Sequence, residues 1–314
     1  VSGLTVVDDI ILPTTMERGR SESASSARAQ AASSFVSTAA CQRNLRSVAT
    51  ALAVGKPVML EGPPGVGKTA LLNELARNCG HSDGMIRIHL DDQLDSKTLL
   101  GSYVCSDEPG QFKWQPGALT QAVRGGRWIV FEDIHCAPFE LLAAIKPLLE
   151  DRVLFVPGRG ERIQAASGFQ LFATQTMHEG PGASSKSSRG GIFSNLFTHV
   201  PVDPLPEEDV RQILDSQFSS SIGCCVPVML DTVRELRAQG MAAKLGRSEF
   251  SLRDLIKWGR RVQLLCRGEA LPAERRVQDM PYAVRMKAVR ESEDSFCAGW
   301  AKPAAKKRAV DAIR

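Results

Sequence analysis

One stretch of eight residues constrains the fold more than any other, and it reads Gly62-Pro63-Pro64-Gly65-Val66-Gly67-Lys68-Thr69. It fits the phosphate-binding pattern G-x-x-x-x-G-K-[ST] at every specified position. Residues 57–61 before it are of strand type, and residues 70–77 after it repeat apolar side chains at helical spacing. Such a loop turns backbone N–H groups toward phosphate oxygens, while the lysine reaches the terminal phosphates and the threonine ligates magnesium. The stretch predicts a nucleotide site formed by all eight residues, with Thr69 as a metal ligand.

A pair of acidic residues follows a second apolar run. Residues 127–131 have the composition of a buried strand, and Glu132 and Asp133 come directly after them. Ligands of a parallel sheet bind at the carboxyl ends of its strands. We therefore expect both carboxylates beside the phosphate loop.

The composition is that of an ordinary globular protein and names no partner. The 314 residues are 43% apolar and 24% charged, with a net charge of +4. No apolar run approaches the length of about 18 residues that spans a bilayer. The eight cysteines contain no C-x-x-C pair and the five histidines lie at no metal-ligand spacing, so we expect buried, reduced thiols in an intracellular protein. Because the chain opens with Val1 rather than methionine, we expect it to be a piece of a longer protein.

The order of predicted elements divides the chain into three parts. Residues 1–34 are expected to be a linker or N-terminal extension, because Ser, Ala, Arg and Glu dominate residues 14–34 without an apolar period. Strand and helix patterns alternate over 35–203, which predicts a parallel α/β sheet. Only helical patterns follow over 204–314, near 206–218, 226–239, 251–267 and 281–299. The five predicted strands are 57–61, 85–90, 127–131, 169–174 and 198–202.

Two hairpins and a glycine-rich loop interrupt the alternation. Residues 103–117 predict a hairpin with two exposed aromatic residues, Phe112 and Trp114, and a second hairpin is expected around residues 156–160. Trp114 is interpreted either as packing or as a contact with a partner. Residues 178–191 are rich in Gly and Ser and predict a mobile loop.

Taken together, these features resemble the AAA+ ATPases. The run LLGSYVCSDEPGQFKWQPGALTQAVRGGRWIVFEDIHCAP and the later PLLEDRVLFVPGRGERIQAASGFQLFAT are most similar to the midasin family, whose first of six tandem modules the chain resembles over residues 35 to 300. The resemblance implies a five-stranded parallel sheet flanked by helices, with β-hairpin insertions and a smaller all-α lid. It also implies an ATPase that uses ATP and Mg²⁺ in a ring with adjoining modules. The implied work is that of a chaperone that remodels pre-60S ribosomal particles, together with their assembly factors, for maturation and nuclear export. The implied location is the nucleolus and nucleoplasm.

Several positions depart from the family pattern. The family usually has Asp-Glu where this chain has Glu132-Asp133, so Glu132 is expected to serve the metal and Asp133 to be a base shortened by one methylene. The γ-phosphate sensor, usually Asn, is Thr176, and the stretch that usually carries an arginine finger reads Asn-Leu-Phe over residues 195–197. Arg253 matches the second sensor of the lid. The resemblance therefore predicts a site that binds ATP and hydrolyses it slowly.

Three readings of the function stay open at this point. The first is the midasin-like module, the second is a stand-alone ATPase of the MoxR type, and the third is a structural scaffold locked by nucleotide. No Asn-Lys-x-Asp sequence for guanine occurs, and adenine is preferred through the resemblance alone. Lys257, Arg260 and Arg261 share a helical face that is expected to be solvated, so sequence-specific nucleic-acid binding is not predicted. Membrane contact is not predicted either, because no apolar run is long enough to span a bilayer.

Overall fold

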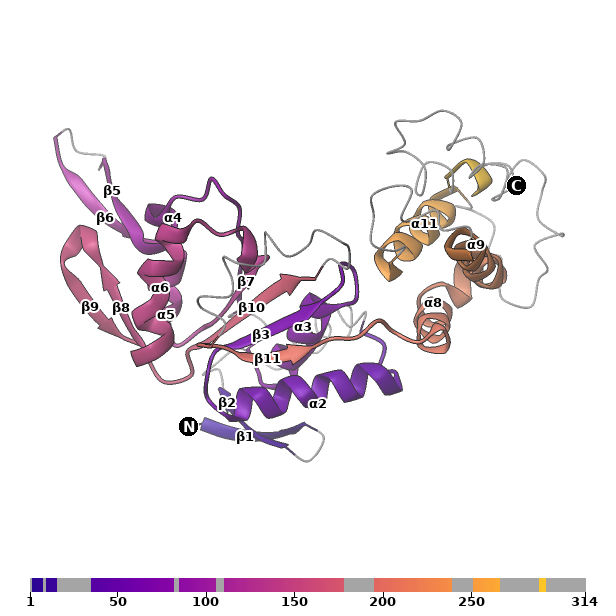
Figure 1. The fold of residues 1–314 in the computed structure, drawn as a ribbon, viewed down its shortest axis with the longest axis horizontal. Coiled ribbons are helices and arrows are strands. Elements are labelled where there is room, and N and C mark those ends of the chain that lie inside the picture. Colours follow the sequence, from indigo (N-terminus) through magenta and orange to yellow (C-terminus); the bar gives the residue numbers. More distant parts are fainter. Residues whose placement is uncertain are drawn as a thin grey trace, which may run out of the picture. The chain divides into compact units, whose positions relative to one another are not determined.

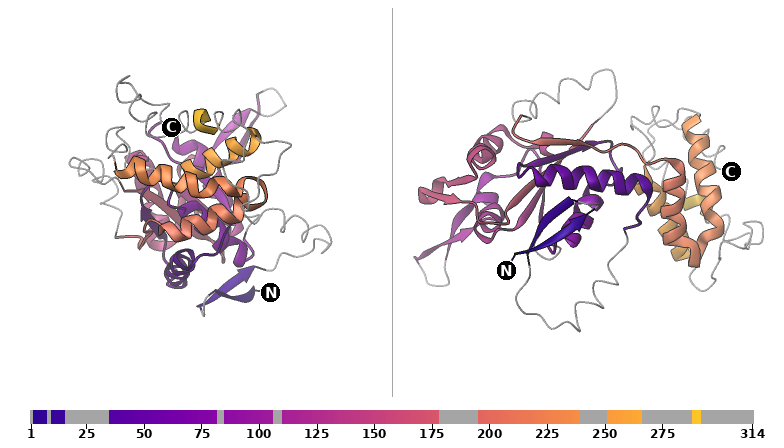
Figure 2. Two further views of the ribbon diagram at one scale, coloured as in Figure 1. Left: turned by 90° about the vertical axis from the view of Figure 1, so that its right-hand side faces the viewer. Right: turned by 90° about the horizontal axis from the view of Figure 1, so that it is seen from below.

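The computed structural model describes residues 2–7, 10–15, 35–81, 85–105, 110–177, 195–238, 251–265 and 288–291. The chain divides into two compact units (Figure 1, Figure 2). The first comprises Val1–Ser33, Gln42–Gly62 and Gly67–Val202, and the second comprises Ser34–Cys41, Pro63–Val66 and Asp203–Arg314.

The first unit is built on a parallel sheet of five strands, as predicted. The strands are β3 (Val58–Gly62), β4 (Ile86–His89), β7 (Trp128–Glu132), β10 (Gln170–Thr176) and β11 (Thr198–Pro201), in the order β11-β3-β10-β7-β4. Residues 128–131 of β7 and 170–175 of β10 are buried without alternation. Such continuous burial is typical of parallel strands covered on both faces. The strand order puts β3, β10 and β7 in the interior of the sheet.

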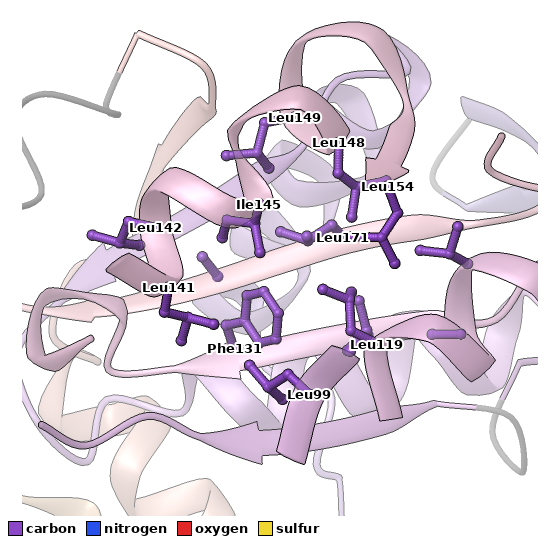
Figure 3. Packing of buried hydrophobic residues seen from close by; sticks show 14 of the residues in the cluster. Leu99, Leu119, Phe131, Leu141, Leu142, Ile145, Leu148, Leu149, Leu154 and Leu171 are labelled. Atoms are coloured by element: carbon purple, nitrogen blue, oxygen red, sulfur yellow. The ribbon is translucent and has the colours of Figure 1, made fainter. Parts of the chain in front are cut away.

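Helices on this unit bury the apolar side chains of the sheet. They are α2 (Ala39–Ala53), α3 (Lys68–Asn78), α4 (Ser96–Leu100), α5 (Ala118–Gly125) and α6 (Phe139–Asp151). Figure 3 shows Leu119 of α5 and Ile145 of α6 against Phe131 and Leu171 of the sheet. Burial of each such side chain stabilises the fold by about 1.5–3 kcal/mol. This packing holds the sheet together, and with it the strand ends that carry the site.

Two separate hairpins extend this unit, as the sequence predicts. The first pairs β5 (Gly101–Cys105) with β6 (Phe112–Pro116), and the second pairs β8 (Val153–Val156) with β9 (Glu161–Gln164). Phe112 is exposed as expected, whereas Trp114 is half-buried. The Trp114 ring meets the edge of Tyr103 at a centroid distance of 5.1 Å and would touch a Cβ at Gly158, 2.9 Å away. The structure thus supports the packing interpretation of Trp114.

The N-terminal region differs from the expected linker. Strands β1 (Ser2–Val7) and β2 (Ile10–Thr15) form an antiparallel pair within residues 1–34. The apolar and β-branched residues at 4–7 and 10–12 favour strands, and only the Ser- and Arg-rich part shaped the prediction. Residues 16–34 and the predicted loop 178–191 lie outside the described residues.

The second unit is helical, as predicted for the lid. Its helices are α8 (Glu207–Ile222), α9 (Val226–Ala238) and α11 (Leu252–Leu265), and a 3₁₀ turn over Gly223–Cys225 joins the first two. Of the predicted helix 281–299, only residues 288–291 are described, and they are helical. Phe218, Val233, Leu255 and Trp258 belong to its buried core.

Two further observations concern the apolar residues and the cysteines. Glu207–Ala238 is long and apolar enough to cross a membrane by length and composition, contrary to the expectation from apolar runs. Because 56% of an apolar 18-residue stretch within it is buried inside the protein, packing of the lid core accounts for its apolar character. The six cysteines in the described part form no disulfide, and four of them are buried.

Candidate nucleotide site

The phosphate loop joins the end of β3 to the start of α3. Gly67 precedes the helix with φ 104°, a left-handed conformation that favours glycine. The first N–H groups of α3 have no partner within the helix and carry partial positive charge, which suits an anion. Lys68 is 8% exposed, and its Nζ donates to the carbonyl oxygen of Gly62 at 2.8 Å. The lysine is therefore held at the mouth of the loop.

The tip of the loop, Pro63–Val66, belongs to the second unit. Gly65 has φ 76°, and a Cβ there would lie 2.5 Å from the Cβ of Ser251 and 3.5 Å from that of Arg253. The backbone N–H and hydroxyl of Ser251 both donate to Asp254, at 3.0 and 2.9 Å, and this fixes the start of α11. Within the second unit, the Cβ of Arg253 therefore lies near Gly65, and a contact of its guanidinium with phosphate stays a prediction.

A threonine and a carboxylate form the metal side of the site. The Thr69 hydroxyl donates to Oε1 of Glu132 at 3.1 Å, across 63 positions of sequence. Hydroxyl and carboxylate oxygens are ligands of magnesium, which commonly takes one or two carboxylates and completes its shell with phosphate and water. The described residues hold no group of three His, Cys, Asp or Glu side chains suited to a metal. Thr69, Glu132 and the loop thus fit a magnesium ion that arrives with a nucleotide.

Asp133 has a separate environment from Glu132. Its backbone is left-handed, with φ 56°, and its N–H donates to the Thr174 hydroxyl oxygen at 3.2 Å. Thr176 donates from Oγ1 to Oδ1 of Asp133 at 2.8 Å. The structure thus brings Asp133 and Thr176 together, and the hydroxyl predicted to sense phosphate contacts the carboxylate.

Two histidines near the site were missed by reasoning from the sequence. His89 ends β4, and its Nδ1 lies 3.7 Å from Oδ2 of Asp133. His199 of β11 lies 2.7 Å from Oε1 of Glu61, the residue before the loop. Both histidines lie on strands next to a strand that carries site residues. The order of strands in a sheet cannot be predicted from local sequence patterns, so the sequence did not indicate either contact.

The position expected to carry an arginine finger lies at the amino end of β11. Asn195 is exposed and Phe197 is buried at 6% exposure. Phe197 packs into the sheet core, whereas Asn195 presents an amide with no formal charge.

Comparison with known proteins agrees with this geometry. Residues 57–189 match the family model of the AAA domain, dynein-related subfamily, and residues 209–314 match that of the midasin AAA lid domain. Midasin of Dictyostelium discoideum is 52% identical over 184 residues, which are 59% of this chain and 3% of that protein. Protein NorQ of Paracoccus denitrificans (strain Pd 1222) is 34% identical over 119 residues, or 38% of this chain and 43% of NorQ.

A solved structure supports the fold. NtrX from Brucella abortus in complex with ATP superposes with a TM-score of 0.54 at 16% identity, covering 92% of this chain and 72% of NtrX. The chain spans only a small fraction of the midasin relative's length. The two family models together match most of the chain, one after the other, in the order of the two units. The chain belongs to the dynein-related AAA family of ATPases, as a midasin-type AAA domain followed by its lid.

Proposed function

We propose that this chain is a nucleotide-binding module of a midasin-type protein that holds ATP with magnesium and hydrolyses it slowly. The phosphate loop, Lys68 and the pair of Thr69 with Glu132 supply what binding requires. When bound, ATP supplies the γ-phosphate bond and magnesium neutralises its charge. The residues of the chain bind and orient the nucleotide.

One observation carries the proposal of slow hydrolysis. Asp133 stands where the family usually has Glu, and its Oδ1 accepts the Thr176 hydroxyl at 2.8 Å. The shorter side chain displaces a base by about 1 Å, a scale that can lower a rate by about a hundredfold. Loss of a stabilising donor typically lowers turnover by a further 10² to 10³, roughly. We infer that bound nucleotide serves mainly as a structural support.

The wider role rests on the relatives. We propose that the module works in a six-module ring with adjoining AAA+ modules, that the ring remodels pre-60S particles for maturation and export, and that it acts in the nucleus. The match to the midasin lid model over residues 209–314 favours this role over a stand-alone ATPase of the MoxR type. The third hypothesis, a structural scaffold locked by nucleotide, differs from this proposal in one respect. In such a scaffold, motion of the ring would not depend on nucleotide at this site.

The test is single-turnover hydrolysis in the full-length protein, with the phosphate-loop lysine replaced in every other module. We expect a rate far below about one per second, the lower end for typical enzymes. Changing Glu132 and Asp133 to Asp and Glu, together with Thr176→Asn, should raise the rate. Turnover near one per second from the unmodified module would overturn the proposal of slow hydrolysis.

A further inference from the structure

The side chain of Asp133 lies between the ends of two neighbouring strands. The sheet order places β7 between β10 and β4, and each of these three strands contributes one residue near its carboxyl end. Thr176 of β10 donates to Oδ1 at 2.8 Å, and Nδ1 of His89 on β4 lies 3.7 Å from Oδ2. Each carboxylate oxygen of Asp133 thus faces a different neighbour.

The backbone of Asp133 is fixed in the same place. Its left-handed φ of 56° is uncommon for a residue with a side chain, and such positions persist where the surroundings determine them. The Asp133 N–H donates to Thr174, which is 3% exposed, and the 3₁₀ turn Ile134–Cys136 follows at once. Asp133 is therefore held through both its backbone and its side chain.

The chemistry of a hydroxyl limits what Thr176 can do in addition. A threonine hydroxyl has one hydrogen to donate, whereas an asparagine amide has two. Phosphate oxygens and the Asp133 carboxylate both accept hydrogen bonds. While Thr176 donates to Asp133, it has no hydrogen left for a phosphate. An asparagine at this position could donate to both groups at once.

We propose that Thr176 is a positioning residue for Asp133 and does not sense the γ-phosphate. The inference rests on the proposed nucleotide binding and gives Thr176 a role different from the one the family pattern implies. It follows that the preference of the site for ATP over ADP does not depend on Thr176. It also follows that Thr176 and Asp133 are coupled when no nucleotide is present.

The first experiment measures this preference in the 314-residue chain. The probes are ADP and the slowly hydrolysed analogue ATPγS, each titrated with magnesium into wild type and the variants Thr176→Val, Thr176→Ser and Thr176→Asn. We expect Thr176→Val and Thr176→Ser to keep the ratio of the two dissociation constants within about twofold of wild type. Thr176→Asn adds a second donor and should shift the ratio toward ATPγS by about tenfold or more, the effect of one hydrogen bond to a charged group.

A loss of about tenfold in ATPγS affinity with unchanged ADP affinity, seen in Thr176→Val and rescued in Thr176→Ser, would overturn the proposal. The second experiment uses no nucleotide and therefore separates this inference from the proposed function. Thermal unfolding midpoints are compared for Thr176→Val, Asp133→Ala and the double variant. We expect Thr176→Val to lower the midpoint by roughly 2–4 °C in the wild type, and by much less when Asp133 is already replaced.

The matched control is Thr198→Val, the same chemical change at the amino end of β11, where residue 198 pairs with Val58. Its effect should be the same with Asp133 or with alanine at that position. Equal, additive shifts for Thr176→Val in both backgrounds would show that the contact does not hold Asp133. If wild type binds neither ADP nor ATPγS, the proposed function fails, while the unfolding comparison still decides the role of Thr176.

Discussion

Replacing Lys68 by alanine tests the phosphate loop most directly, because the structure separates its effect on binding from its effect on folding. Hydrogen bonds that involve charged groups contribute about 1.5–3 kcal/mol. Since about 1.4 kcal/mol is a tenfold change in affinity, Lys68→Ala should weaken ATP binding by roughly 10- to 150-fold. ADP should lose less, because it lacks one of the phosphates that the lysine reaches.

The fold should tolerate this substitution. The Gly62 carbonyl that accepts from Nζ of Lys68 also accepts from the Met177 N–H at 3.1 Å, so it stays hydrogen-bonded when the lysine is lost. We expect the free energy of unfolding without nucleotide to fall by about 1.5–3 kcal/mol, the contribution of the lost hydrogen bond of a charged group. Calorimetry with Mg²⁺–ATP measures the affinity, and urea unfolding measures the stability.

A matched control lies at the other end of the same strand. Lys56 is exposed just before β3, and its backbone carbonyl accepts a hydrogen bond from the Gln170 side chain. Lys56→Ala removes the same charge and should leave ATP affinity unchanged. Equal affinities for wild type and Lys68→Ala would refute the assignment of the loop as the nucleotide site.

Two further predictions concern the scaffold of the site. Gly67→Ala places a side chain at φ 104° and should lower stability by about 1–2 kcal/mol in urea unfolding. The control is Gly125→Ala, where φ is outside the left-handed region and a Cβ meets the Arg127 side chain at an ordinary 3.6 Å. Equal stability of Gly67→Ala and wild type would contradict the backbone argument. Burial lowers the pKa of His81, which stacks on Trp128 at 4.5 Å, so the unfolded chain binds the proton more readily. The contribution of neutral, buried His81 to folding stability is therefore complete above the unfolded-state pKa of about 6.5 and is lost as pH falls below it. The urea midpoint should drop with falling pH less steeply in His81→Phe than in wild type.

The sequence predicted the parts of the site that are local in the chain. The phosphate loop is contiguous, and the adjacent strand and helix follow from periodicity over residues 57–77. The approach of Thr69 to Glu132 joins residues 63 apart, and it was expected because both follow the carboxyl ends of strands in a predicted parallel sheet. Contacts of His89 depend on which strands are neighbours, a property that no local pattern encodes.

In the N-terminal region, the sequence contains two local patterns, and the prediction followed only one of them. The polar composition of residues 14–34 led to a linker or N-terminal extension over 1–34, whereas residues 4–7 and 10–12 are apolar or β-branched and form strands. Trp114 belongs to a hairpin that was predicted correctly, but its burial depends on Gly158 in the second hairpin. The absence of a side chain at Gly158 makes room for the ring, and this is a tertiary effect.

The reversed order of the two acids changes both halves of the site in a consistent way. Glu132 is the longer acid, and its carboxylate reaches the Thr69 hydroxyl on the metal side. Asp133 is the shorter acid, and its carboxylate lies against Thr176 and near His89. Under the proposed function, binding depends on the first carboxylate and hydrolysis on the second, so we expect a single exchange to preserve binding and to weaken hydrolysis. A module that binds ATP without hydrolysing it stays in the conformation that ATP favours, because no ADP forms that would shift the equilibrium between conformations.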